Sequence, residues 1–234
     1  MNGQSPTGTL IVLREITERK ARERKLQQQN ERLEQFASVI SHDLRNPLNV
    51  AQGRINLARE AGDSEHLDTA MDGIERSLEM IEDLLALARG GQDIGDLNRV
   101  DMSELVEECW TTVQTQEATL VSDGSLTVWA DRSRLRQLLE NLFRNAVEHG
   151  GNAVTVRLGY LENGFFVADD GPGIPPEERE SVFGFGYSKR ETGTGFGLAI
   201  VKQVVDAHGW DIRITEGADG GSRFEITDIE VAEG

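Results

Sequence analysis

Residues 132–175 read RSRLRQLLENLFRNAVEHGGNAVTVRLGYLENGFFVADDGPGIP, and this stretch decides the fold of the second half of the chain. It predicts a helix over residues 132–148. Two strands follow, over residues 153–158 and 164–168, with a Glu-Asn-Gly turn between them. The second strand ends in two carboxylates, and a turn rich in glycine and proline comes directly after it.

The flanking sequence continues this mixed pattern in both directions. The further elements that we expect are helices over 102–118 and 196–207 and strands over 126–130, 211–215 and 222–227. Strands and helices do not alternate strictly, so the pattern predicts an α+β fold in the form of an α/β sandwich over residues 98–230.

Residues 36–91 predict a helical hairpin. Apolar side chains recur every three or four residues from Phe36 to Ala58 and again from Leu67 to Ala88, with a polar break between the two runs. Each apolar stripe is too long for a single hairpin to cover. We therefore expect two copies of the chain to form a four-helix bundle, so that the chain is a homodimer.

The first 35 residues predict two shorter elements. Residues 8–16, GTLIVLREI, read as one apolar strand, which is too little for a domain and is interpreted as the last strand of a larger one. Residues 18–35 are highly charged and lack glycine and proline. The seven-residue step from Leu26 to Leu33 favours a coiled coil, with a single solvated helix as the alternative.

The chain has 234 residues and a formal net charge of -17, which is unevenly distributed. Residues 1–60 carry 10 basic and 7 acidic side chains, whereas residues 61–234 carry 14 and 34. Binding to phosphate backbones requires a basic surface, so nucleic acid is excluded as a partner. Only four of the basic residues are lysine. This composition fits a halophile, and it also fits an ordinary acidic cytosolic protein.

Cys109 is the only cysteine, which excludes an internal disulfide and a cysteine-based zinc cluster. No apolar run approaches the roughly 20 residues of a membrane span, and the N-terminus has no signal-peptide pattern. We therefore expect a soluble, cytoplasmic protein without a membrane segment.

His42 lies in the sequence SHDLRNPL, on the predicted first helix of the hairpin. Its position is about 200° around the helix from the apolar stripe, so its ring is on a polar, accessible face. Asp43 can hold one ring nitrogen and leave the other nucleophilic, and Asn46 follows one turn later. Pro47 costs about 3 kcal/mol inside a helix, which favours a functional role over an ordinary surface histidine.

Asn141 and Asn145 lie one helical turn apart and face the same way. With Glu148 and His149 they form a polar cluster that could hold a phosphate and its metal ion, because Mg²⁺ prefers hard oxygen ligands such as amide carbonyls. The alternative is a pair of solvated asparagines on a surface helix.

Two glycine-rich turns complete the candidate site. The turn DDGPGIP, residues 169–175, offers a carboxylate to an exocyclic amine and lets a flat ligand approach the backbone. The turn GTGFGL, residues 193–198, opens a helix and presents amides to a phosphate. No strand precedes it and no Gly-Lys pair occurs, which excludes a dinucleotide fingerprint and a P-loop. For the turn over residues 169–175, an ordinary surface turn is the alternative. Residues 174–192, between the turns, are interpreted as a mobile lid.

Taken in order, these motifs resemble those of the sensor histidine kinases of two-component systems. SHDLRNPL is similar to their phospho-acceptor box, LRQLLENLFRNAVEH to the asparagine box and DDGPGIP to the first glycine box. FGFGYS is similar to the phenylalanine box, GTGFGLAIVK to the second glycine box and GGSRFEI to the closing strand motif. The similarity covers about residues 20–228, and GTLIVLREITERK resembles the end of a PAS sensor domain.

The resemblance implies four parts of the chain. Residues 1–17 would be the final strand of a truncated sensor domain, and residues 18–35 a coiled-coil signalling helix. Residues 36–91 would form the dimerisation and histidine phosphotransfer domain. Residues 98–230 would form a catalytic ATP-binding domain of the type shared with gyrase and Hsp90.

The resemblance also implies a role for each matched residue. His42 matches the phosphorylated histidine, Asp43 the acidic neighbour that assists the transfer, and Asn46 the position implicated in dephosphorylating the regulator. Asn145 matches the Mg²⁺ ligand, and Asn141 lies near the phosphates.

In the glycine-rich turns, Asp170 matches the acceptor of the adenine amine, and Gly171 and Gly173 shape the turn around it. The lid end and the phosphate turn match Gly193, Thr194, Gly195, Phe196, Gly197 and Leu198. The chain departs from the family in having Glu148-His149 where Lys-Tyr is common, and in lacking an arginine at its usual place near the phenylalanine box. Lys189 or Arg190 is expected to supply that charge.

The implied activity uses ATP and Mg²⁺ to phosphorylate His42 and passes the phosphoryl group to an aspartate in the receiver domain of a response regulator. Phosphatase action toward the regulator is compatible with Asp43 and Asn46. Two other classes stay open, namely an ATPase or serine kinase with the same nucleotide fold and a non-catalytic dimeric scaffold. The histidine box argues against the first, and Asp170 and Asn145 argue against the second.

Overall fold

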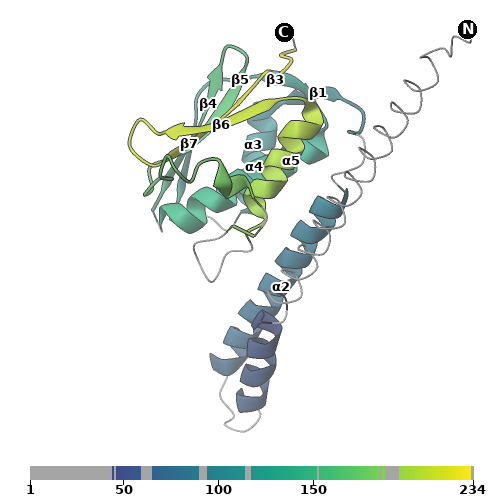
Figure 1. Ribbon diagram of the computed structural model, residues 1–234, viewed down its shortest axis with the longest axis vertical. Coiled ribbons are helices and arrows are strands. Elements are labelled where there is room, and N and C mark those ends of the chain that lie inside the picture. Colours follow the sequence, from purple (N-terminus) through teal and green to yellow (C-terminus); the bar gives the residue numbers. More distant parts are fainter. Residues whose placement is uncertain are drawn as a thin grey trace, which may run out of the picture. The chain divides into compact units, whose positions relative to one another are not determined.

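The computed structural model describes residues 44, 46–58, 65–89, 94–113, 117–151, 153–184, 186–187 and 195–232. The chain divides into two compact units, residues 1–77 and 78–234, and each is described by itself (Figure 1). The predicted strand within residues 1–17 and the predicted coiled coil over 18–35 lie outside the described residues. Among the helices that the structure describes, none is both long and apolar enough to cross a membrane.

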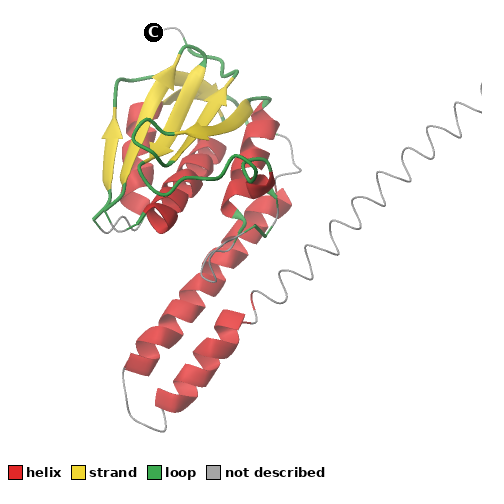
Figure 2. Cartoon of the chain, turned by 60° about the vertical axis from the view of Figure 1, so that its left-hand side comes forward, coloured by secondary structure: helices red, strands yellow, loops and turns green. Residues whose placement is uncertain are grey.

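The first unit contains two helices that lie side by side as the predicted hairpin (Figure 2). One helix covers residues 46–58, and the other is α2, Glu65–Arg89, whose last turns are counted with the second unit. The α2 helix ends at Arg89, directly before the glycine pair that the sequence marks as its end. The hairpin prediction is therefore confirmed over the residues described.

Small residues form the contact between these two helices. A Cβ atom on Gly73 would lie 2.9 Å from the carbonyl oxygen of Pro47 and 3.4 Å from the Cβ of Ala51, so only glycine permits this approach. The Ser77 hydroxyl donates to the Gly73 carbonyl oxygen at 2.8 Å and satisfies its own polar group within the helix. Alanines fill the rest of the contact and are buried: Ala51, Ala58 and Ala70.

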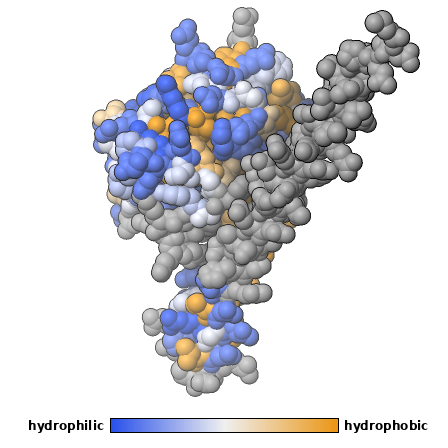
Figure 3. Space-filling model, viewed as in Figure 1, coloured by the Kyte–Doolittle hydropathy of each residue, from blue (hydrophilic) through white to orange (hydrophobic). Residues whose placement is uncertain are grey.

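The larger apolar side chains of the hairpin are exposed. Leu48 is 46% exposed and Met71 is 57% exposed, although both belong to the predicted apolar stripes. Figure 3 shows apolar side chains beside polar ones on the visible surface of the hairpin. The exposed apolar residues of this unit are Leu48, Val50, Ile55, Leu57, Leu67 and Met71. Two helices alone therefore leave a substantial part of the stripes in water, as the sequence predicts.

The second unit is built on a five-stranded sheet in the order β2-β4-β5-β7-β6. Its strands are β2 (Thr119–Ser122), β4 (Thr155–Leu161), β5 (Gly164–Asp169), β6 (Asp211–Glu216) and β7 (Ser222–Thr227). Strand β2 runs parallel to β4, and every other neighbouring pair is antiparallel. A separate antiparallel pair joins β1 (Asn98–Asp101) to β3 (Thr127–Ala130), and Val231 extends it through a bridge to Val128.

Three helices lie together on one face of the five-stranded sheet (Figures 1 and 2). They are α3 (Met102–Thr112), α4 (Arg132–Gly150) and α5 (Gly197–His208). The period-2 pattern of β5 explains this arrangement, because Phe165 and Val167 are buried while Phe166 lies on the opposite face. There the Arg223 guanidinium covers the Phe166 ring at 3.6 Å from its centroid. The sheet thus has an apolar face under the helices and a mixed face toward water.

Most predicted elements of this unit agree with the structure to within two residues. Strand β4 ends at Leu161 rather than at residue 158, and three further details differ. The α3 helix ends at Thr112 rather than near 118, because Val113 turns to an extended backbone and donates its amide to the Cys109 carbonyl. Residues 98–101 and 119–122 form β1 and β2, which the sequence does not predict. Both strands have only four residues, and their partners are distant in the chain, so no local pattern reveals them.

Candidate nucleotide-binding site

Helix α4 carries both of the predicted asparagines. Asp131 is its N-cap, and the Asp131 carboxylate accepts hydrogen bonds from the amides of Ser133 and Arg134 at 3.0 and 3.2 Å. Asn141 is only 6% exposed, and its Nδ2 donates to the Gln137 carbonyl oxygen at 2.8 Å. That bond fixes the amide orientation of Asn141 and leaves Oδ1 as its remaining polar atom.

Helix α5 begins directly against Asn141. A Cβ atom on Gly197 would lie 3.0 Å from Oδ1 of Asn141, so the absence of a side chain allows this approach. The N-cap residue Phe196 is fully buried and makes no side-chain cap, and Leu198 in the first turn is half-buried. The first turn of α5 therefore lies beside Asn141, and Phe196 supplies no side-chain cap to its amides. Backbone amides at the start of a helix suit the binding of an anion.

Asn145 lies one turn beyond Asn141 on α4 and is half-buried. An i, i+4 pair shares one helix face, so its amide is on the same side as the start of α5. The structure thus brings together the two asparagines and the last part of the predicted phosphate turn.

The two carboxylates at the end of β5 have different environments. Asp169 continues the inward series of Phe165 and Val167, is half-buried, and its Oδ1 accepts from the amides of Gly171 and Ser222 at 2.9 and 3.3 Å. Asp170 is exposed, and its Oδ1 accepts from the Thr155 amide on β4 at 2.8 Å. The carboxylate that faces the helix layer is therefore Asp169, whereas the family resemblance implies Asp170.

The alternation along β5 identifies Asp169 once the buried face of the strand is known, because side chains two residues apart in a strand share a face. Burial raises the pKa of the Asp169 carboxyl, while the two amide bonds oppose that rise. A half-buried carboxylate held by backbone amides is a fixed hydrogen-bond acceptor, and such groups concentrate at functional sites.

The glycines after Asp169 allow the turn to pack against two other elements. A Cβ atom on Gly171 would lie 2.7 Å from the Cα of Gly150, at the end of α4. Gly173 has φ +74°, and a Cβ atom there would lie 3.0 Å from the Gly221 carbonyl oxygen, just before β7. Gly171 therefore allows the Asp169 turn to lie close to the C-terminal end of the helix that carries the asparagines, and Gly173 allows it to lie against the residues before β7.

The segment after this turn returns to the start of α5. The Gly186 amide donates to the Gly195 carbonyl oxygen at 3.1 Å, so these two positions are joined. The Tyr187 hydroxyl donates to Oε2 of Glu178 at 2.8 Å, which ties Tyr187 to the residues before the short helix η1, Ser181–Phe183. The residues that lie outside the described part of the chain include Lys189, Arg190, Gly193 and Thr194, together with all of the predicted lid beyond Tyr187.

The predicted phospho-acceptor residues are described only in part. Asn46 is exposed on the helix of residues 46–58, and Pro47 is half-buried there against Gly73. His42 and Asp43 lie outside the described residues.

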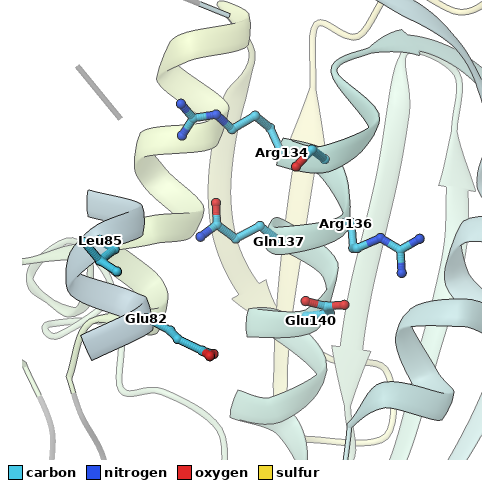
Figure 4. Close-up of a pocket in the computed structure, with 7 residues that line it drawn as sticks. Glu82, Leu85, Arg134, Arg136, Gln137 and Glu140 are labelled. Atoms are coloured by element: carbon cyan, nitrogen blue, oxygen red, sulfur yellow. The ribbon is translucent and has the colours of Figure 1, made fainter. Parts of the chain in front are cut away.

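A cavity of about 420 Å³ lies elsewhere in the second unit, between α2 and the first turns of α4 (Figure 4). The residues that line it are Glu82, Leu85, Ser133, Arg134, Arg136, Gln137 and Glu140. None of the predicted nucleotide-site residues lines this cavity.

Two protein-family models match the chain. The His Kinase A (phospho-acceptor) domain matches residues 32–93, and the histidine kinase-, DNA gyrase B- and HSP90-like ATPase matches residues 130–232. Together the two matches span more than half of the chain. The second family fits the α/β sandwich with its asparagines and glycine-rich turns, and it implies ATP binding.

Known proteins show the same similarity. The chain is 30% identical to the sensor histidine kinase CpxA of Escherichia coli (strain K12) over 211 residues, which cover 82% of this chain and 46% of CpxA. It is 32% identical to the signal transduction histidine-protein kinase/phosphatase MprB of Mycolicibacterium smegmatis, covering 85% of this chain and 45% of MprB. The solved structure of full-length ShkA in complex with AMPPNP is similar with a TM-score of 0.58 and 26% identity, covering 86% of this chain and 47% of ShkA.

The chain therefore belongs to the sensor histidine kinases of two-component systems. It spans less than half the length of CpxA and MprB.

Proposed function

We propose that the chain binds ATP in its second unit, transfers the γ-phosphoryl group to His42, and then passes it to an aspartate of a response regulator. The observation that carries this proposal is that helix α4 meets the start of α5 at Asn141 and the Asp169 turn at Gly150, in a chain that also matches a phospho-acceptor domain. ATP is an intracellular substrate, so this part of the protein is proposed to act in the cytoplasm.

The nucleotide would be held from both ends. Asp169 is the better candidate than Asp170 for the adenine amine, because its carboxylate faces the helix layer and is fixed by two amides. The triphosphate would lie at the start of α5, where amides and the helix dipole favour negative charge. Gly195 and Gly197 allow close approach of the backbone there, and Lys189 stays a predicted contributor of charge.

Mg²⁺ fits the donor set at this site. Asn145 offers an amide oxygen on the same helix face as Asn141, and phosphate oxygens would complete the shell, as is usual for this hard cation. When bound, the ion neutralises phosphate charge. The chain has a formal net charge of -17, so binding of the triphosphate should depend on Mg²⁺ more strongly than it would in a basic protein.

The transfer itself would depend on positioning. The His42 imidazole nitrogen would attack the γ-phosphorus as the bond to the ADP oxygen breaks, and Asp43 would hold the other ring nitrogen. Homodimerisation is proposed because Leu48, Ile55, Met71 and other large apolar side chains of the hairpin are exposed in one chain.

The regulator is proposed as the acceptor because response regulators receive phosphoryl groups from kinases of this family. Phosphatase action toward it is a second proposed activity, since one relative is named a kinase/phosphatase and Asn46, within the histidine box, is exposed.

The test is incorporation of labelled γ-phosphate by the full chain and by two variants. His42→Gln should abolish incorporation and keep MgATP affinity, because the nucleotide residues are all in the second unit. His66→Gln is the matched control, since this histidine lies on α2 outside the predicted acceptor box, and it should incorporate label normally. Label that survives in His42→Gln, or that resists acid as a serine ester does, would favour the ATPase or serine kinase class instead.

A further inference from the structure

His208 connects the C-terminal end of α5 to the N-terminal end of α4. Its Nδ1 lies 2.8 Å from the Val204 carbonyl oxygen, and its Nε2 accepts from the Asp131 amide at 3.1 Å. A backbone amide can only donate and a carbonyl can only accept, so the ring must carry its proton on Nδ1 and be neutral. These two backbone contacts alone determine the tautomer of the His208 ring.

The ring is also held by stacking. His208 and Trp210 lie with ring centroids 4.1 Å apart and an angle of 25° between their planes. Gly209 between them adopts a left-handed conformation as the C-cap of α5, which folds Trp210 back over the histidine. His208 is half-buried and Trp210 is 8% exposed, so the stacked pair is largely removed from water.

Asp131 extends this connection in a second direction. While its amide is bound to His208, its carboxylate caps α4 through Oδ1 and accepts from the Gly95 amide through Oδ2 at 3.2 Å. Gly95 belongs to the segment that enters β1. One residue therefore joins α5, the start of α4 and the chain segment before β1.

We propose that His208 is a positioning residue, which aligns α4 and the Gly95 segment with α5 only while its imidazole is neutral. The proposal rests on the proposed function in one respect, since α4 and α5 carry the residues assigned to the nucleotide. A protonated ring would place a second N–H donor against the Asp131 amide, so the contact would be lost and the start of α4 would be released.

The surroundings of the ring favour the neutral form. Burial lowers the pKa of His208 below its ordinary value of 6.5, and the positive charge of Arg134 acts in the same direction. The Val204 carbonyl and the negative charge of Asp131 oppose this shift. Because the folded form binds the proton less readily than the unfolded chain, this stability contribution is complete above about pH 6.5 and is lost as the pH falls through the folded pKa.

The test compares three full-length proteins across pH 5 to 8 by thermal unfolding. His208→Phe keeps a ring for stacking and removes both hydrogen bonds, so its midpoint at pH 7.5 should fall by about 2–12 °C. His208→Gln can place an acceptor near the Nε2 position and does not titrate. It should recover most of the loss at pH 7.5 and reduce the fall in midpoint that we expect for the wild type below pH 6.5. A merely structural role for the ring would not change the pH profile in this way.

Two further measurements make the outcome specific. The His208 ring signals in an NMR titration should have a midpoint below 6.5. MgATP affinity should drop in His208→Phe and recover in His208→Gln. A pH profile shared by the wild type and His208→Gln, or a midpoint at or above 6.5, would overturn the proposal. If the wild type itself binds no MgATP, the proposed function fails, whereas the unfolding and NMR results still judge His208.

Discussion

The replacement of Asp169 by asparagine tests the nucleotide site most sharply. The asparagine oxygen can still accept from the Gly171 and Ser222 amides, at 2.9 and 3.3 Å from Oδ1 in the wild type. Burial raises the pKa of this carboxyl, which means that the fold favours its uncharged form. Asp169→Asn should therefore unfold at or above the wild-type temperature near pH 7.

Binding should respond in the opposite direction. With its oxygen directed to the two backbone amides, the side chain would present an NH₂ group to the adenine amine, so donor would face donor. A hydrogen bond to a charged acceptor contributes about 1.5–3 kcal/mol, which corresponds to about a 10–150-fold loss of ATP affinity. Calorimetric titration with MgATP measures this loss directly, and inosine triphosphate, which lacks the amine, should lose much less affinity.

Asp170→Asn is the matched control. Asp170 is exposed, and an asparagine can still accept from the Thr155 amide, so ATP affinity should stay within about twofold of the wild type. If Asp170→Asn weakens ATP binding and Asp169→Asn does not, the assignment made from the two environments is wrong and the choice made from the sequence is right.

Two further predictions concern stability and are measured by denaturant unfolding. Gly173→Ala should lower the free energy of unfolding by about 1–2 kcal/mol or more, because φ is +74° and the new Cβ would lie 3.0 Å from the Gly221 carbonyl oxygen. Gly53→Ala should raise the free energy of unfolding by about 1 kcal/mol, because Gly53 lies in a helix and its new Cβ would have no neighbour within 4 Å. Equal effects of these two alanines would contradict the backbone argument. Phe143→Ala should cost about 3–5 kcal/mol, because Phe143 is fully buried and meets Trp110 edge-on at 5.5 Å, and a loss below 1 kcal/mol would show that α4 is not packed as described.

The sequence predicts the elements that have a clear local pattern of apolar spacing or turn residues. The apolar spacing along α4 identifies a helix almost to its last residue, and the Glu-Asn-Gly turn identifies the β4–β5 hairpin. Both patterns are local, since an amphipathic helix or a tight hairpin is specified by residues close in the chain.

The features that the sequence misses depend on distant partners. Strand β2 exists because its residues pair in parallel with β4, and Thr119 lies opposite Thr155. The preference for Asp169 over Asp170 depends on which face of β5 meets the helices, and the alternation contains that information only once the sheet is known. The contact of His208 with Asp131 joins residues 77 positions apart and has no signature in either motif.

The central proposal is that the second unit phosphorylates His42, and the most direct measurement is to locate the phosphate. The full chain is incubated with Mg²⁺ and ATP labelled at the γ-position, digested under basic conditions and mapped by mass spectrometry. We predict one phosphorylated peptide that contains His42, whose label is lost in acid and retained in base. Label on a serine or threonine, or ATP hydrolysis without any labelled peptide, would contradict the proposal.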